Sequence, residues 1–495
     1  MSLRSIVKSS GWLLISNIIS RFGNIFTLAM LARILGPENL GSFNLTQQTV
    51  TTSNSLSQLG VDAAIHTNGA KHETFGKKYT GRLFGTGSSL IVFTALIISI
   101  FLWLFRFKVA SDFFPEENIN QWMFVVCLII FFTASSNPCW LYLQAFRKFK
   151  LFSIRSSILS FLNFVVLIIM SHLYGLGGAL YGLLIVSLIT FIISIFLAKN
   201  VLRDFDIRLR FDKFISQSKS ILKFGLPFYA NNFLGGLISL PLLFYLGIST
   251  GIENVAYVRT AETFAQMISF IPIALSPVII SYLSSLTNKD KNQFNILRSL
   301  HFRITTAITF FICFISLLSV NFFLPMLFGK IYIEAAVLTK ITLISSFFNS
   351  ISSILSQYLI SEGRTKVLGL TGTVSVLVFL GLALILIPNF GTIGFLIAKG
   401  FIPIFSFLIF SYLISKSLLK KDMHQSRNLF LVIIIALISN FLLSNIFIYN
   451  YSFLSLFLNS IILFSSLLII YIYIFTAKEK YKIFLILNQK LKSLY

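Results

Sequence analysis

Long apolar runs dominate the sequence and restrict what it can fold into. They recur from about residue 9 to residue 475, and most hold 20 residues or more. A helix needs roughly 20 apolar residues to cross a bilayer, where no water can satisfy a broken backbone hydrogen bond. With 56% hydrophobic residues and 55 Phe among 495, the composition also excludes a set of soluble domains. The pattern predicts one all-α polytopic membrane protein.

Charged residues, glycine and proline divide the apolar runs into about fourteen predicted transmembrane helices. Their approximate ranges are 9–35, 40–65, 82–105, 120–142, 152–172, 176–198, 221–247, 253–285, 302–322, 333–360, 367–387, 391–414, 429–449 and 452–475. An even number of crossings places both termini on one side of the membrane.

The basic residues are distributed unevenly between the two predicted sides. With the N-terminus in the cytoplasm, 32 of the 40 Lys and Arg fall in or beside inside loops, and only Arg106, Lys108 and Lys330 fall outside. Cytoplasmic loops of membrane proteins carry this excess, so we expect a multi-pass protein with both termini cytoplasmic. The net charge of +24 then reflects orientation and attraction to membrane lipids, and nucleic-acid binding is not needed to explain it.

The longest predicted inside loop, 199–220, divides the chain into an N-terminal lobe of six helices, 1–198, and a C-terminal lobe of six helices, 221–415. An accessory helix pair with a basic tail, 416–495, follows. The first outside turns of the lobes, "LARILGPENLGSFNLTQQ" and "LFYLGISTGIENVAYVRTAE", are alike, which favours a repeated structure. Neither the cysteine spacing nor any cluster of ligand-type residues predicts a metal site.

Polar residues inside the predicted spans are the candidates for function, because membrane helices turn them toward protein or a water-filled cavity. They form helical stripes in spans one, two and eight, with further residues in spans seven, ten and twelve. The residues are Asn17, Arg21 and Asn24; Gln47, Thr51, Asn54 and Gln58; Arg259, Glu262 and Gln266; Asn231 and Asn232; Lys340; and Lys399. We expect a hydrated cationic cavity between the lobes. Hydrogen bonds that only pack the bundle are the alternative.

Two carboxylates belong to the same regions. Glu262 lies three residues after Arg259, so it can form a salt bridge on one helical face or take an active part in transport. Asp62, near the cytoplasmic end of span two, is a candidate helix cap or a proton or sodium site.

The segments "ISRFGNIFTLAMLARILGPENLGSFNL", "SQLGVDAAI", "FGLPFYANNF" and "IPIALSPVIISYLSSL" resemble polysaccharide-biosynthesis flippases. These are O-antigen-type lipid-linked oligosaccharide transporters of the multidrug/oligosaccharidyl-lipid/polysaccharide exporter superfamily. The resemblance implies a V-shaped pair of lobes that open alternately to the two sides of a bacterial inner membrane. It also implies an undecaprenyl-pyrophosphate-linked glycan as substrate, as in lipopolysaccharide biosynthesis. Arg21 and Arg259 match cavity arginines of such flippases, whereas Pro241 and Leu242 lie where the family often has an acidic residue.

The leading hypothesis is a flippase, not an enzyme, that moves lipid-linked oligosaccharide from the cytoplasmic to the periplasmic leaflet. Guanidinium groups suit pyrophosphate because they donate paired, charge-assisted hydrogen bonds. Lys340 and Lys399 either face the cavity and add to the cationic site or extend their ammonium groups to the outer membrane interface. A polysaccharide polymerase and glycosyltransferases are the expected partners, and no cofactor is expected beyond a coupling proton or sodium ion.

Two alternatives remain open from the sequence. A cation-coupled multidrug exporter of the same superfamily would need a carboxylate that exchanges its ion, for which Asp62 and Glu262 are the candidates. A membrane enzyme, such as a glycan polymerase or ligase, would need catalytic groups on a long outside loop. The predicted outside loops are short and contain no histidine.

Overall fold

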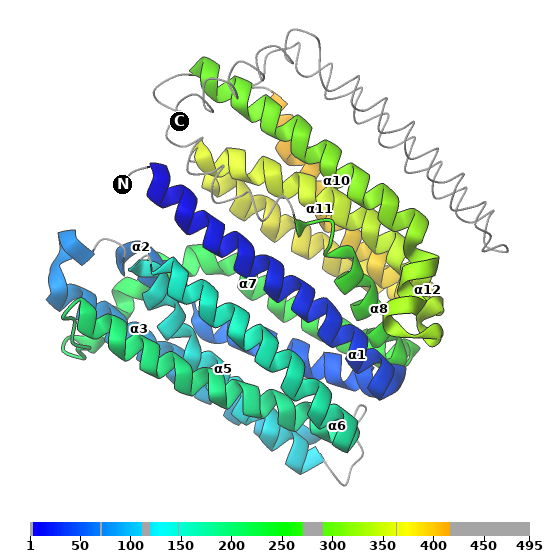
Figure 1. Ribbon diagram of the computed structural model, residues 1–495, viewed down its shortest axis with the longest axis horizontal. Coiled ribbons are helices and arrows are strands. Elements are labelled where there is room, and N and C mark those ends of the chain that lie inside the picture. The colour runs from blue at the N-terminus through cyan, green and yellow to red at the C-terminus, as the bar shows by residue number, and fades with distance from the viewer. Residues whose placement is uncertain are drawn as a thin grey trace. The chain divides into compact units, whose positions relative to one another are not determined.

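The computed structural model describes residues 3–69, 72–110, 119–146, 148–270, 291–362 and 364–415, and all secondary structure within these ranges is helical (Figure 1). The elements are α1 (Leu3–Gln58), α2 (Val61–Gly69), α3 (His72–Leu104), α4 (Arg106–Ala110), α5 (Ile119–Ala145), α6 (Phe149–Asp204), α7 (Phe214–Thr250), α8 (Ile252–Ala265), α10 (Lys291–Phe328), the 3₁₀ helix η2 (Lys330–Ala335), α11 (Ala336–Ser361) and α12 (Thr365–Ser415).

Eight of the described helices are long and apolar enough to cross a membrane, and three of them are too long for one crossing. Their apolar stretches in α1, α6 and α12 hold 44, 56 and 49 residues. A straight helix of that length would span roughly 65–85 Å, at least twice the hydrocarbon thickness of about 30 Å. A non-helical glycine (Gly36, Gly175 or Gly391) divides each stretch, so each provides two crossings.

This division confirms a polytopic helical membrane protein and matches the predicted span pairs one and two, five and six, and eleven and twelve. The count of fourteen stays a prediction. Spans thirteen and fourteen, and residues 271–285 of span eight, lie outside the described residues.

The turns within α6 and α12 have nearly the same backbone geometry. Gly175 has φ 58° and ψ −136°, and Gly391 has φ 52° and ψ −128°. Three residues later, Gly178 and Gly394 let the returning helix pass its predecessor. An added Cβ would lie 1.9 Å from the Met170 carbonyl oxygen and 2.1 Å from that of Leu386, respectively. Two turns of equal design, about 215 residues apart, are expected of a chain built from repeats.

The predicted second span, 40–65, is interrupted in the structure. α1 ends at Gln58, and Leu59 and Gly60 both take positive φ, 47° and 76°, before α2 begins at Val61. Asp62 lies in the first turn of α2, where a carboxylate is favoured by the helix dipole. Its capping role stays a prediction.

Two compact units are distinguished by their contacts. Unit 1 comprises Met1–Phe264, Leu324–Thr339 and Thr365–Ile402, and unit 2 comprises Ala265–Phe323, Lys340–Arg364 and Pro403–Tyr495. The boundaries of the predicted lobes, 1–198 and 221–415, stay a prediction. The predicted linker 199–220 is helical at both ends, because α6 continues to Asp204 and α7 begins at Phe214.

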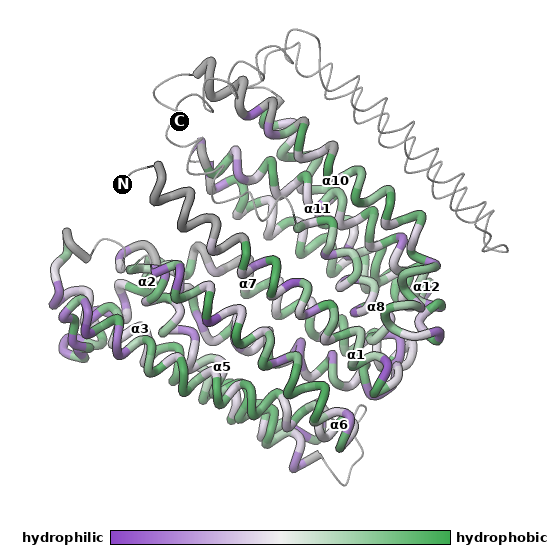
Figure 2. Tube along the Cα trace, in the orientation of Figure 1, coloured by the Kyte–Doolittle hydropathy of each residue, from purple (hydrophilic) through white to green (hydrophobic). Residues whose placement is uncertain are grey.

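Large apolar side chains are exposed along the helices, as expected where lipid is the solvent. Phe93, Phe161 and Phe196 are each more than 60% exposed. Figure 2 shows hydrophobic residues along most of the helix lengths and hydrophilic ones gathered at the end of α3 nearest the α6–α7 connection. This distribution follows the predicted membrane core and its cytoplasmic border.

Within unit 1, the second half of α1 packs closely against α7 and the start of α8. Near the ends of this contact lie glycines with almost no room for a side chain. A Cβ on Gly41 would lie 2.1 Å from the Ile252 carbonyl oxygen, and one on Gly60 would lie 2.4 Å from the backbone of Gly225. Between them, the Tyr229 hydroxyl donates to the Ser55 carbonyl. These contacts set the position of α8, which carries the candidate site.

Candidate substrate-binding site

The candidate site begins at the turn between α7 and α8. Gly251, at φ 103°, ends α7, and Asn254 then donates its side-chain amide to the Thr250 carbonyl. Glu253 occupies the first turn of α8, where its charge complements the helix dipole. The short turn sends α8 directly back into the bundle, so Arg259 lies about 12 Å along the helix from Gly251.

Lys399 reaches the same depth from α12. Its position is eight residues after Gly391, as Arg259 is eight residues after Gly251. The two turns are adjacent, since a Cβ on Gly391 would lie 3.2 Å from the Thr250 side chain. The Lys399 ammonium also lies 5.7 Å from the centre of the Phe395 ring. The two cations therefore belong to one layer of unit 1.

Glu262 joins these two cations into a cluster. The Lys399 ammonium donates a short hydrogen bond to Oε1 of Glu262, and Nη1 of Arg259 lies 3.8 Å from Oε2. The Glu262 side chain is 19% exposed, whereas Arg259 and Lys399 are 34% and 42% exposed. The predicted Arg259–Glu262 salt bridge is present, but Lys399 makes the direct contact. The two cations thus share one carboxylate, and the cluster keeps one net positive charge.

Arg33 lies at the end of the first half of α1, three residues before Gly36. Its Nε donates to the Leu327 carbonyl at 2.9 Å, and its Nη2 donates to the Met326 carbonyl. These carbonyls belong to the last turn of α10. Carbonyls in the last turn of a helix have no N–H group of a following turn from which to accept a hydrogen bond. Arg33 therefore caps α10 at the end of unit 1 that carries the turns.

The predicted stripe of span one lies deeper. Arg21 is half-buried, and Asn17 and Asn24 are exposed. Arg21 precedes Gly36 by fifteen residues, so it lies roughly 22 Å along α1 from that turn. Unit 1 therefore holds cations at two depths, Arg21 in the deeper layer and the Glu262 cluster nearer the turns.

The predicted stripe of span two is partly engaged in packing. The Asn54 amide donates to the Thr133 hydroxyl of α5 at 2.8 Å, and the Thr51 hydroxyl donates to the Gln47 carbonyl of its own helix at 2.7 Å. Gln47 and Gln58 are half-buried. For Asn54 and Thr51 the contacts fit the packing alternative, whereas Gln47 and Gln58 are only partly buried.

The remaining candidates are dispersed. Lys340 belongs to unit 2 and is only 2% exposed, and Gln266 is exposed at the end of α8. Asn231 and Asn232 lie within α7, but their side chains are outside the described part of the structure. Among the residues that are described, no group of three His, Cys, Asp or Glu could hold a metal ion.

Two buried arginines were missed by the sequence reasoning. Arg155, assigned to a cytoplasmic loop border, is 4% exposed on α6; its guanidinium lies over the Trp140 ring and donates to Ser194. Arg298, on α10, is 2% exposed and contacts Glu362 at 2.8 Å. Both lie near predicted span borders, where position alone suggested solvent. The signal that could have indicated their burial is that each arginine shares a helical face with residues that are buried.

The fold and the intramembrane charge cluster define the class of this protein as a polytopic helical transporter. The structure is similar to "Lipid II flippase MurJ, inward closed conformation", with a TM-score of 0.69 and 17% identity, covering 92% of this chain and 97% of that one. It is also similar to an inward-facing multidrug resistance MATE family transporter of the MOP superfamily, with a TM-score of 0.60 and 16% identity, covering 81% and 98%.

The sequence comparisons are more specific than the fold. Residues 6–287 match the family described as "Polysaccharide biosynthesis protein", and the chain belongs to that family. A "Putative O-antigen transporter" of Shigella flexneri is 22% identical over 425 residues, which are 83% of this chain and 98% of that protein. The predicted family is thereby confirmed.

Proposed function

We propose that this protein is a flippase that carries an undecaprenyl-pyrophosphate-linked oligosaccharide from the cytoplasmic to the periplasmic leaflet by alternating access. The observation that carries the proposal is the cluster of Arg259, Glu262 and Lys399, in which two partly exposed cations share one carboxylate within a membrane helix bundle. Its support is the family of the chain, the O-antigen transporter relative and the lipid II flippase with the same fold.

A pyrophosphate is a suitable ligand for such a cluster. Arg259 can donate two hydrogen bonds to one phosphate, and Lys399 can add a third from the neighbouring helix. Glu262 neutralises one of the two positive charges until the substrate arrives and competes with the phosphate afterwards, which assists release. Arg21, about 10 Å deeper along the helix axis, would bind the pyrophosphate first. The amides of Gln47, Gln58 and other stripe residues would contact sugar hydroxyls.

The proposal includes an orientation. Both termini would lie in the cytoplasm of a bacterium, and the turns at Gly36, Gly251 and Gly391 would face the periplasm. Cysteine labelling from each side of intact cells tests this, with single cysteines placed at Ser5 and at Lys330. Label reaching Ser5 from outside would reverse the orientation.

The functional test is complementation of a strain without this flippase. Deletion should accumulate lipid-linked repeat units on the cytoplasmic face, and the wild-type gene should restore surface polysaccharide. Arg21→Ala, Arg259→Ala and Lys399→Ala should fail to restore it despite normal membrane levels. Lys330→Ala, which removes an exposed cation at the turn, is the matched control. Normal surface polysaccharide in the deletion strain, with no second flippase, would refute the proposal.

Glu262→Gln separates an active carboxylate from a structural one. If Glu262 assists release, the variant should bind the pyrophosphate-linked substrate more tightly and export it more slowly. Unchanged export with normal protein levels would assign Glu262 to structure only.

The alternative is a cation-coupled multidrug exporter. A multidrug resistance MATE family transporter has a similar fold. Such a transporter needs a carboxylate that can release its ion. Glu262 is held by two cations, and Asp62 contributes to the start of α2. Altered drug susceptibility on overexpression, with normal polysaccharide in the deletion strain, would favour this alternative.

The proposed partners of the flippase are the glycosyltransferases that make the glycan and the polymerase that consumes it.

A further inference from the structure

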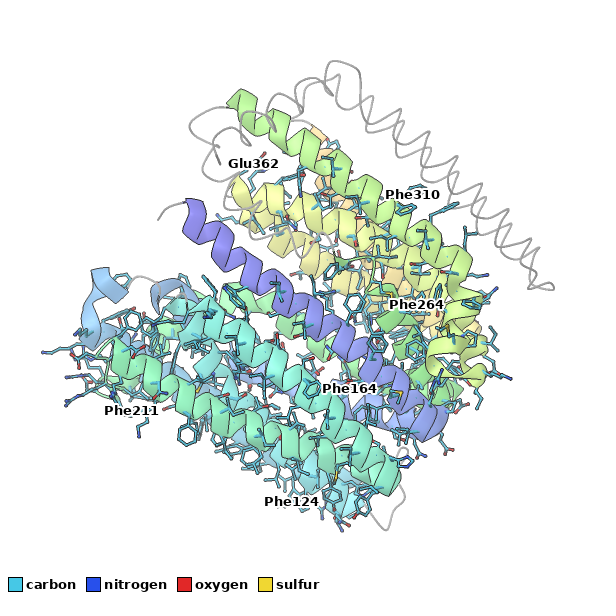
Figure 3. All side chains as sticks on the ribbon, in the orientation of Figure 1. Phe124, Phe164, Phe211, Phe264, Phe310 and Glu362 are labelled. Atoms are coloured by element: carbon cyan, nitrogen blue, oxygen red, sulfur yellow. The ribbon has the colours of Figure 1, made fainter. Side chains whose placement is uncertain are left out.

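The connection between α6 and α7, residues 205–213, and the first two residues of α7, 214 and 215, together form a strap across the end of α3, and the strap is firmly anchored. Phe205 stacks on Phe146 with ring centres 4.2 Å apart, and Ile207 is 5% exposed within the core of unit 1. Figure 3 shows Phe211 farther along the strap, at the end of the α3–α5–α6 bundle opposite to Phe124. The strap therefore starts in the core and continues along the border of the bundle.

Backbone contacts hold the middle of the strap against α3. The Arg210 amide donates to the Gly81 carbonyl at 3.1 Å. A Cβ on Gly81 would lie 2.2 Å from the Arg208 carbonyl oxygen, and one on Gly85 would lie 2.5 Å from that of Arg210. These two glycines let the strap lie directly on the helix backbone, so backbone contacts as well as side chains hold its conformation.

The acidic side chains of the strap are used in the same docking. Asp206 accepts from the Lys77 ammonium at 2.9 Å, and Asp212 accepts from Nε of Arg82 at 2.6 Å. Each hydrogen bond lowers the pKa of its carboxyl. Arg208, Arg210 and Lys213 are exposed and form no ion pair with another residue in the described ranges. The outward charge of the strap is therefore positive.

The level of the strap in the membrane follows from α3. From Leu104, where α3 ends, to Gly85 the helix rises about 28 Å, close to the hydrocarbon thickness of about 30 Å. The strap crosses α3 between Gly85 and Gly81. It therefore lies at the level of the lipid headgroups.

Apolar side chains on the strap remain uncovered at that level. Leu209 and Phe211 are 41% and 57% exposed, and Phe214 and Ile215, where α7 begins, are 38% and 73% exposed. They alternate with Arg208, Arg210 and Lys213. A segment with this pattern places apolar groups in the acyl border and cations among phosphates.

We propose that the strap is a binding surface for acidic phospholipids of the leaflet that it faces. The inference goes beyond the proposed transport and relies on it only for the assignment of that leaflet as cytoplasmic. The partner is a phospholipid with a net negative headgroup, because three cations face outward beside four exposed apolar side chains. Each cation at an anionic surface strengthens binding roughly fivefold, so removal of all three should weaken it on the order of 100-fold.

The test uses the purified full-length protein in a neutral detergent. Short-chain phosphatidylglycerol is the probe, and phosphatidylcholine of the same chain length is the neutral comparison. The triple variant Arg208→Gln/Arg210→Gln/Lys213→Gln should lose its preference for phosphatidylglycerol. The matched control, Lys199→Gln/Arg203→Gln/Lys223→Gln, removes the same charge from exposed positions on the adjoining helices and should keep most of it.

A second variant separates placement from charge. Gly85→Val retains every cation but forces the strap off α3, so phosphatidylglycerol binding should fall although the net charge is unchanged. Equal losses in the strap variant and its matched control would show unspecific charge attraction and overturn the proposal. Wild-type affinity for phosphatidylglycerol in the strap triple variant would also overturn the proposal, and the surface would then be assigned to binding of a cytoplasmic protein.

Discussion

The close contact between Gly60 and Gly225 gives a prediction whose size can be worked out from the structure. Gly60 has φ 76° and a Cβ position 2.4 Å from the Gly225 backbone, so Gly60→Ala meets two obstacles. The left-handed conformation costs an L-residue about 1–2 kcal/mol, and forcing packed backbones apart costs about 1–3 kcal/mol. We expect Gly60→Ala to lower the free energy of unfolding by about 3 kcal/mol.

Three matched glycines isolate the two costs. Gly36 has φ 72° with nothing within 4 Å of a Cβ, so Gly36→Ala carries only the conformational cost, about 1 kcal/mol after the gain from a stiffer unfolded chain. Gly225 lies in α7 without a positive φ and carries only the steric cost, about 1–2 kcal/mol after its gain in helix propensity. Gly235, in the same helix with open space, should be neutral or stabilised by up to about 1 kcal/mol as alanine.

The assay is denaturant unfolding of each purified full-length variant in detergent, followed by tryptophan fluorescence. The expected order of destabilisation is Gly60→Ala, then Gly225→Ala, then Gly36→Ala, then Gly235→Ala. If Gly36→Ala cost as much as Gly60→Ala, backbone conformation alone would explain the result. If Gly225→Ala behaved like Gly235→Ala, the close approach of Gly60, between α1 and α2, to α7 would be refuted.

Three further predictions concern charged and titratable groups. Glu362→Gln removes the negative charge that lies 2.8 Å from the buried Arg298 and should cost about 3 kcal/mol in the same unfolding assay, and a cost below that of Gly36→Ala would contradict the buried ion pair. Burial lowers the pKa of His301 from 6.5 to about 4. Between these pH values the unfolded chain binds more protons than the folded protein. The free energy of unfolding should therefore fall by up to about 3 kcal/mol as the pH drops from 6.5 to 4. His301→Gln should flatten this dependence, and an unchanged slope would place the titration elsewhere. Arg33→Gln removes the cap from the last turn of α10 and should cost about 1 kcal/mol, whereas Lys330→Gln, a nearby exposed cation, should cost almost nothing.

The architecture could be predicted from the sequence because it follows from local patterns. Apolar runs mark crossings, and glycine marks where they turn, so the span pairs around Gly36, Gly175 and Gly391 were predicted correctly. The stop at Leu59 and Gly60 was missed, because the apolar pattern of span two continues through it.

The partners of the charged residues could be predicted only when they lay on one helix. Helical spacing indicated the contact between Arg259 and Glu262, three residues apart. It could not indicate Lys399, which is 137 residues from Glu262 and reaches it only through the packing of α12 beside α8. Periodicity gives the face that a residue occupies, but the helix opposite that face is set by tertiary packing.

The tight turns at Gly36, Gly175, Gly251 and Gly391 also limit how this protein can be recognised and how it can diverge. Each turn has few residues between its two helix ends, so in the proposed orientation these turns offer periplasmic proteins little surface to bind. They also leave little room for insertions. Relatives that handle different glycans would therefore have to differ within the helices themselves. In such a scaffold, grafting loops between relatives should leave specificity unchanged, whereas exchanging helix faces should transfer it.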